Sequence, residues 1–177
     1  MELTMCNLSR RTALGLLAGV SALALCLPQA ARADATRLDL PKPGPRDTCP
    51  VCGMFVARYP DWIATVVFAD GAAFHFDGPK DFFKFVAEVP KYAAGRRRDQ
   101  ITAMGVTDYY GLRPIAAETA LYAVGSDVLG PMGHEFVPLA SEAEAADFMR
   151  DHAGKRLLRF ADIPADLPAK LDEGRFE

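Results

Sequence analysis

Two short stretches of this chain carry side chains that could hold a soft metal ion. Residues 49–54 read Cys-Pro-Val-Cys-Gly-Met, so a pair of thiols is followed at once by a thioether. Residues 131–134 read Pro-Met-Gly-His, which places a second thioether and an imidazole within one short segment. Thiolate and thioether ligands together favour Cu(I), whereas Mg²⁺ and Ca²⁺ select oxygen and typical zinc sites do not use methionine. The residue types therefore predict a Cu(I) site.

The residues around the sulfur atoms favour convergence on one point. Gly53 can adopt backbone angles that other residues avoid, so it can turn the sulfur atoms of Cys52 and Met54 toward each other. Met132 lies in a Pro/Gly turn, where a core methionine is unusual. If the two halves of the chain pack face to face, the turn can complete the site. The predicted metal ligands are Cys49, Cys52, Met54, Met132 and His134.

Alternatives stay open for several of these side chains. Met54 can be an ordinary packing residue, because methionine fills irregular gaps in cores. His134 can be a surface residue at the start of a strand. His75 is a further ligand candidate, since it alternates with Phe74 and Phe76 and so faces away from them.

The remainder of the chain offers little for catalysis. No GxSxG, GxGxxG or P-loop pattern occurs, and the spacing of the acidic residues gives no reason to pair two of them as general acid and base. We therefore expect a protein that is not an enzyme and has no small-molecule substrate. The 177 residues are 50% hydrophobic, which is enough for a core, and the net charge of −3 predicts no nucleic-acid partner and no basic membrane patch.

The N-terminus has the pattern of an export signal. Arg10 and Arg11 precede an apolar run from Ala13 to Leu27, which is shorter than the roughly 20 residues that a membrane span requires. Residues 31–33 match the small-x-small pattern at which signal peptidase cuts. We predict a twin-arginine signal over residues 1–33 and a periplasmic mature protein. A retained or lipidated signal would attach the protein to the membrane.

Removal of this signal would leave Cys49 and Cys52 as the cysteines of the mature chain. Two cysteines cannot form a closed four-cysteine zinc site. In the oxidising periplasm they could instead serve a thiol–disulfide oxidoreductase, or form a structural disulfide or part of a zinc site in a binding module. A redox CxxC motif usually opens a helix of a βαβ unit, whereas this pair lies on a Pro-rich approach to a hairpin.

Hydrophobic patterning divides the mature chain into two similar halves. Each half contains two strands of a hairpin, a helix and a third strand. The predicted strands cover 62–68, 73–77 and 100–110 in the first half, and 119–124, 134–139 and 155–160 in the second; the predicted helices are at 81–86 and after Ser141. Ser141 and Glu144 form a capping box at the start of the second helix.

These elements predict an α+β fold made of two tandem ββαβ units with antiparallel hairpins. A Pro-rich tether over residues 34–48 precedes the first unit. The units cover 49–110 and 111–165, with a turn at 130–133, and a C-terminal tail covers 166–177.

Together these segments resemble the NosL family. The residues that carry the resemblance are CPVCGM at 49–54, Phe76-Asp77, Thr107-Asp108-Tyr109, GPMGHEFVPL at 130–139 and the segment 154–162, so it covers roughly residues 49–163. It implies a pair of ββαβ units, and it points to Cys52, Met54 and Met132 as copper ligands, with Cys49 and His134 beside them. Many relatives are lipoproteins, and the twin-arginine signal of this chain departs from that pattern.

The resemblance also implies a role. A member of this family would be a periplasmic Cu(I) carrier. It would deliver copper to apo nitrous oxide reductase, or to its maturation machinery, for the copper–sulfur catalytic centre of that enzyme.

Overall fold

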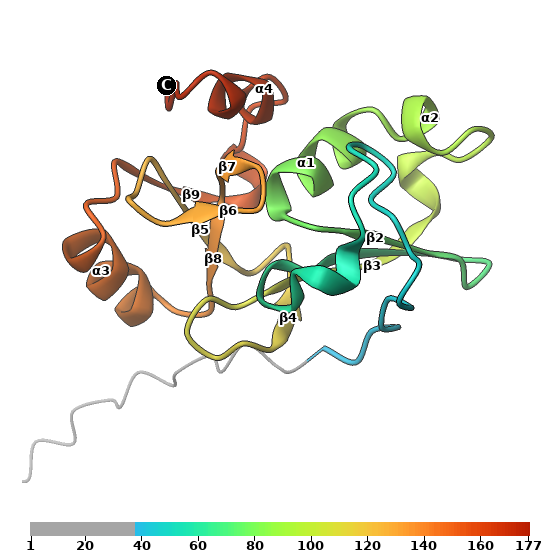
Figure 1. The fold of residues 1–177 in the computed structure, drawn as a ribbon, viewed down its shortest axis with the longest axis horizontal. Helices are drawn as coiled ribbons and strands as arrows, with labels where there is room; N and C mark the ends of the chain where they lie inside the picture. Colours follow the sequence, from blue (N-terminus) through green and yellow to red (C-terminus); the bar gives the residue numbers. More distant parts are fainter. Residues whose placement is uncertain (1–37) are drawn as a thin grey trace, which may run out of the picture. The chain divides into compact units, whose positions relative to one another are not determined.

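The computed structural model describes residues 38–177, so the predicted signal peptide and residues 34–37 of the predicted tether lie outside the described residues. The described chain combines helices with antiparallel sheets, which confirms the predicted α+β class (Figure 1). Within residues 38–177, no helix has the length and apolar character needed to cross a membrane.

The first half is built on a four-stranded antiparallel sheet with the strand order β2-β1-β3-β4. The predicted hairpin forms, and a third strand pairs with the other edge of β1. Helix α1 begins directly after β2 and packs on β1 and β2, so the end of β2 and the first turn of α1 are neighbours. The elements are β1 (Ala64–Phe68), β2 (Ala73–Phe76), α1 (Pro79–Ala87), α2 (Val89–Tyr92), β3 (Ile101–Thr107) and β4 (Pro114–Ala116).

The second half repeats this plan with a three-stranded sheet in the order β8-β5-β9. Its helix again lies between the second and third strands of the unit. The elements are β5 (Leu121–Val124), β8 (Val137–Leu139), α3 (Glu142–Asp151) and β9 (Arg156–Arg159). The Ser141 cap is confirmed, since the Glu144 N–H donates to Ser141 Oγ at 3.2 Å. The reciprocal bond differs from a standard capping box, because Glu144 Oε2 accepts the N–H of Ala140, the residue before the N-cap, at 2.9 Å.

The predicted strand at 134–139 is interrupted. Its first part belongs to a small hairpin of β6 (Leu129–Gly130) and β7 (Gly133–His134), whose tip is the predicted turn at 130–133. Glu135 and Phe136 then leave the sheet before β8 begins, because Glu135 is only 3% exposed and its carboxyl group binds the N-terminus of α1.

Two further boundaries differ from the sequence patterns. Strand β3 ends at Thr107 rather than at 110, because Asp108 accepts the Gly111 N–H at 2.8 Å and turns the chain toward β4. The C-terminal segment contains helix α4 (Leu167–Asp172), which buries Leu167 and Leu171 and packs against α1 and β7.

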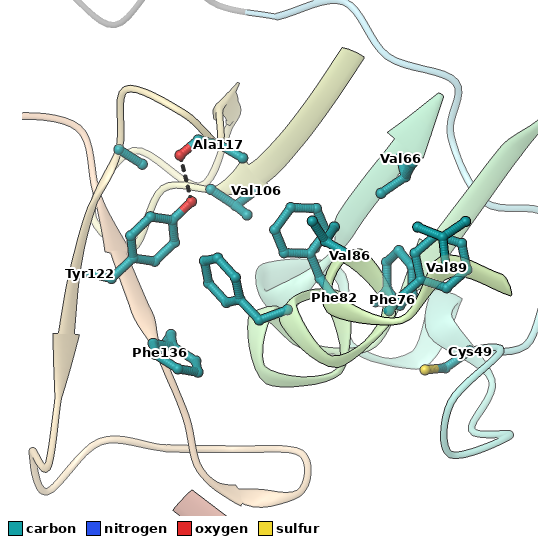
Figure 2. Close-up of a cluster of buried hydrophobic side chains, with 14 of the residues drawn as sticks. Cys49, Val66, Phe76, Phe82, Val86, Val89, Val106, Ala117, Tyr122 and Phe136 are labelled. Carbon is teal, nitrogen blue, oxygen red and sulfur yellow. Dashed lines mark hydrogen bonds between the residues drawn. The ribbon is translucent and has the colours of Figure 1, made fainter. Parts of the chain in front are cut away.

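The buried side chains of α1 join the two halves. Phe82 packs edge-to-face on Phe76 of β2, with ring centroids 5.8 Å apart, and Phe83 packs edge-to-face on Tyr122 of β5 at 5.0 Å. Figure 2 shows this continuous cluster, in which the Tyr122 hydroxyl donates to the Ala117 carbonyl at 2.7 Å. Cys49 belongs to the same cluster, so the first residue of the predicted metal motif is anchored in the core.

Candidate metal centre

The segment Cys49–Met54 forms a closed loop. Thr48 and Phe55 pair as an isolated antiparallel bridge, and inside this bridge the Cys49 N–H donates to the Met54 carbonyl at 2.8 Å. The Gly53 N–H donates back to the Cys49 carbonyl at 2.9 Å, and Gly53 has a φ of +80°. This left-handed conformation favours glycine, which confirms that Gly53 adopts backbone angles that other residues avoid.

The loop brings both thiols to the junction of β2 and α1. Within the described part of the chain, one group of His, Cys, Asp and Glu side chains holds enough ligand atoms for a metal ion. It consists of Cys49, Cys52, Asp77 and Asp81, whose ligand atoms all lie within 4.8 Å of one another. We call this group the Cys/Asp cluster. Asp77 follows the last residue of β2 and Asp81 lies in the first turn of α1, so the strand-to-helix junction positions both carboxylates.

Each thiol is paired with one carboxylate. Cys49 Sγ donates to Asp81 Oδ2 at 3.4 Å, and Cys52 Sγ donates to Asp77 Oδ1 at 3.2 Å. Asp77 is 1% exposed, and among residues 38–177 its second oxygen, Oδ2, has no hydrogen-bond partner. A buried carboxylate oxygen without a donor is costly, so the cluster contains an acceptor that is available to an incoming cation or proton.

The surroundings keep both thiols protonated. Burial raises the pKa of the Cys49 thiol well above its usual range, and the negative charge of Asp81 raises it further. Burial, together with hydrogen bonds to Asp81 and Asp77, raises the pKa of Cys52 to about 12. A thiolate at this position would be desolvated and would lie beside two negatively charged carboxylates. A bound cation would compensate both the desolvation and the repulsion. Both cysteines are free thiols in the structure.

The predicted methionine ligands lie on two different elements. Met54 is on the cysteine loop itself and is half-buried. Met132 is 44% exposed at the tip of the β6–β7 hairpin, where its carbonyl accepts a hydrogen bond from Lys80 Nζ at 2.8 Å. Lys80 precedes Asp81 in the first turn of α1, so this contact ties the hairpin tip to the helix that carries part of the cluster.

The histidines are placed outside the Cys/Asp cluster. His134 is half-buried, and its ring packs edge-to-face against Phe176 with centroids 5.0 Å apart. His75 is buried on β2, where its Nδ1 and Thr65 Oγ1 share a hydrogen bond of 2.9 Å and burial lowers its pKa. His134 stays a predicted ligand that is not a member of the Cys/Asp cluster.

The N-terminus of α1 is closed by a residue of the second half. Glu135 Oε1 accepts the backbone N–H groups of Lys80 and Phe136. A Cβ atom at Gly78, the residue before the helix, would collide with the same carboxyl group, so glycine is needed for its close approach. Burial raises the pKa of Glu135 to about 8, against the opposing effect of Lys80. This cap leaves the side chains of Asp77 and Asp81 free to meet the thiols.

Sequence reasoning did not identify Asp77 and Asp81 as part of the site. They are four residues apart, on either side of a Gly-Pro step that ends a strand and begins a helix. That spacing alone describes an ordinary acidic helix N-terminus. Their role becomes visible only when the loop at 49–54, distant in sequence, is placed beside them.

The fold and the cluster define a class: an α+β protein of two ββαβ units with a thiol–carboxylate centre suited to a metal ion. The crystal structure of the copper chaperone NosL from Shewanella denitrificans matches with a TM-score of 0.59 and 23% sequence identity, over 71% of this chain and 95% of that one. At this identity the match shows the shared fold. The family model for NosL matches residues 42–168, so this chain belongs to the NosL family. A search of curated proteins finds no significant match.

Proposed function

We propose that this protein is a Cu(I) chaperone that delivers copper for assembly of the catalytic copper centre of nitrous oxide reductase. Membership of the NosL family and the structural likeness to a copper chaperone support the copper cargo. The observation that carries the proposal is the convergence of Cys49 and Cys52 at a partly buried loop that also contains Met54. Paired thiols beside a thioether are the donor chemistry that Cu(I) prefers.

The proposed ligand set combines sulfur atoms from two segments of the chain. Cys52 and Met54 bind from the loop, and Met132 binds from the hairpin tip on the neighbouring element. Cys49 is anchored in the core, so it provides a fixed thiolate or a hydrogen bond to the bound sulfur. His134 is an additional ligand if the hairpin moves.

The two carboxylates explain how the cargo can leave. When Cu(I) replaces the thiol protons, the thiolates lie beside the carboxylates of Asp77 and Asp81. The single positive charge of Cu(I) then balances only part of the negative charge of the thiolates and carboxylates. Like charges at this distance weaken the complex relative to a site that holds thiolates alone. A partner ligand that approaches at the exposed Met132 can then take over the metal stepwise.

The cellular setting is part of the same proposal. The receiving partner is apo nitrous oxide reductase or its maturation machinery, and transfer takes place in the periplasm after twin-arginine export. The protein acts as a carrier and not as an enzyme. If the signal is retained or lipidated, the same exchange takes place at the membrane surface.

One structural observation favours a second candidate, a zinc-binding module. Two thiols and two carboxylates within 4.8 Å can satisfy a tetrahedral zinc ion. The redox alternative has less support, because a Cys52 pKa of about 12 disfavours the thiolate that a thiol–disulfide oxidoreductase needs.

An anaerobic Cu(I) titration of the reduced mature protein against a coloured chelator tests the proposal. We expect stoichiometric binding that weakens in both Cys52→Ser and Met132→Ala variants. Binding that depends on Cys52 alone would remove Met132 from the ligand set. No competition with the chelator, together with tight binding of Zn²⁺, would replace the copper proposal with the zinc module.

A transfer assay then tests the partner. Copper-loaded protein mixed with copper-free nitrous oxide reductase should lose its metal to the enzyme faster than to an unrelated apo-protein with exposed cysteines. Equal rates for both acceptors would contradict the proposed partner.

A further inference from the structure

A continuous chain of charged contacts links the cysteine loop to the Met132 turn. It starts at Cys49, whose thiol donates to Asp81 Oδ2, and continues through Lys84 Nζ, which lies 3.1 Å from Asp81 Oδ1. Lys84 Nζ also contacts Asp172 Oδ2 at 2.8 Å.

The chain ends at the hairpin tip. Asp172 Oδ1 contacts Lys80 Nζ at 2.9 Å, and Lys80 Nζ donates to the Met132 carbonyl at 2.8 Å. Asp172 therefore bridges two lysines of α1 with its two oxygens. One of these lysines faces the Cys/Asp cluster and the other faces the hairpin.

The burial of the participants shows which links are rigid. The Lys80 side chain is 1% exposed, so its ammonium group depends on the Met132 carbonyl and Asp172 for hydrogen bonds in place of water. Asp172 is 43% exposed at the end of α4. The hydrogen bonds from Lys84 and Lys80 lower its pKa against the effect of burial, so it is ionised at neutral pH.

Helix α4 has a second reason to stay in place. Leu167 and Leu171 are buried in the same core cluster as Cys49 and Phe82, and α4 packs on both α1 and β7. Figure 1 shows α4 next to the β6–β7 hairpin and α1. The C-terminal segment is thus anchored by apolar contacts and presents one carboxylate to the lysines of α1.

The Met132 turn needs such a support. Met132 is 44% exposed, and β6 and β7 contribute two residues each, which is a short ladder for a hairpin. The contact from Lys80 to the Met132 carbonyl fixes the backbone of the turn while it leaves the thioether side chain free. A ligand on a mobile hairpin loses entropy when it binds a metal, and a backbone already held in place reduces that loss.

We infer that Asp172, through Lys80, is a positioning residue that holds the Met132 turn against α1, the helix that carries Asp81, and so completes the copper site from two separate elements. This inference rests on the proposed function, in which Met132 is a copper ligand. It assigns the C-terminal helix a part in metal binding. Asp172 itself does not contact the metal.

A double-mutant cycle tests the inference. Cu(I) affinity is measured by competition with a chelator for the unmodified protein, Asp172→Asn, Met132→Ala and the double variant. We expect Asp172→Asn to weaken binding by about tenfold, the lower end of the range for partners of metal ligands, and to have no effect once Met132 is replaced. Lys80→Met should reproduce the loss, because it removes the same contact with a side chain of similar length.

Asp166→Asn is the matched control. Asp166 precedes the same helix and pairs with Lys170, so its replacement removes an equal charge without touching the bridge. It should leave Cu(I) affinity unchanged. Thermal unfolding of every variant checks that α4 remains folded.

The outcomes separate the inference from the proposed function. If Asp172→Asn weakens binding equally with and without Met132, it acts through charge and the positioning inference is wrong. If Asp172→Asn has no effect while Met132→Ala weakens binding, the inference is wrong and the ligand assignment stands. If Met132→Ala has no effect while Cys52→Ser does, the ligand assignment is wrong and the inference falls with it.

Discussion

The N-termini of α1 and α3 occupy equivalent positions in the two units but are used in opposite ways. Ala64 of β1 pairs with Phe76, and Leu121 of β5 pairs with Leu139. The residue before each helix lies two positions after the strand end, at Gly78 after Phe76 in the first unit and at Ser141 after Leu139 in the second. The acids Asp81 and Glu144 then lie at the same place in the first turn of their helices.

In the second unit this turn is satisfied locally. Ser141 accepts from the Glu144 backbone, and the Glu144 carboxylate accepts from the Ala140 backbone. In the first unit Gly78 offers no side chain, and the helix is capped instead by Glu135 from the other unit. Asp81 can therefore accept a hydrogen bond from the Cys49 thiol. The comparison shows that α1 is capped by a distant residue, Glu135, and that the Asp81 side chain is therefore available to contact a thiol.

The largest effect that we expect is the pH dependence of copper binding, which belongs to the first unit because that unit contains both thiols. The raised pKa values keep Cys49 and Cys52 protonated up to high pH, so each cysteine that binds as thiolate must release one proton. We expect Cu(I) affinity to rise with pH, by about 100-fold per thiolate between pH 6 and pH 8. Chelator competition across this range measures it.

The slope of the logarithm of Cu(I) affinity against pH also gives the number of thiolates that form. Cys49→Ser and Cys52→Ser should each reduce it by one proton if both cysteines bind, and only one variant should do so if a single cysteine binds. An affinity that does not change with pH in the unmodified protein would show that no thiolate forms.

Removal of the distant cap should have the next largest effect. Glu135→Ala leaves the buried N–H groups of Lys80 and Phe136 without their acceptor, so we expect the free energy of unfolding to fall by about 3 kcal/mol. Chemical denaturation measures this loss. Glu135→Gln keeps one acceptor oxygen and should cost less; an equal loss would mean that packing, and not the cap, decides the effect.

Replacement of a cluster carboxylate tests its role beside the thiols. Asp77→Asn removes a buried negative charge next to Cys52, which lowers the thiol pKa and should strengthen Cu(I) binding at pH 7 by about tenfold. Chelator competition measures the change. Glu144→Gln changes an acid at the start of the other helix and should leave copper affinity unaltered.

The same variant separates the two metals. Zinc that uses Asp77 as a ligand would bind less tightly to Asp77→Asn. Weaker Cu(I) binding in this variant would mean that the carboxylate contacts the metal and that our account of copper release is wrong.

The smallest expected effect belongs to the locally capped helix. Ser141→Ala removes the Ser141 cap and should lower the free energy of unfolding by about 1 kcal/mol. Copper affinity should stay the same, since α3 carries no part of the centre. A clear change in affinity would show that the two helix starts are coupled, although α1 and α3 are buried in separate hydrophobic clusters.

The sequence by itself determined most helices and strands and the cysteine loop at residues 49–54. The hairpin at β1–β2, the helix after Pro79, the cap at Ser141 and the turn at 130–133 all follow from local patterns, because their stabilising contacts lie within a few residues along the chain. The special conformation of Gly53 was predicted for the same reason.

The tertiary structure decided which side chains surround the thiols. Asp77 and Asp81 meet Cys49 and Cys52 across an interval of 25 to 32 residues, and Glu135 reaches α1 across 55. No local pattern marks such contacts, since each partner alone is compatible with an exposed acid. The break at Glu135 in the predicted strand and the helix in the C-terminal segment have the same origin: burial against α1 outweighed the local preference of the chain.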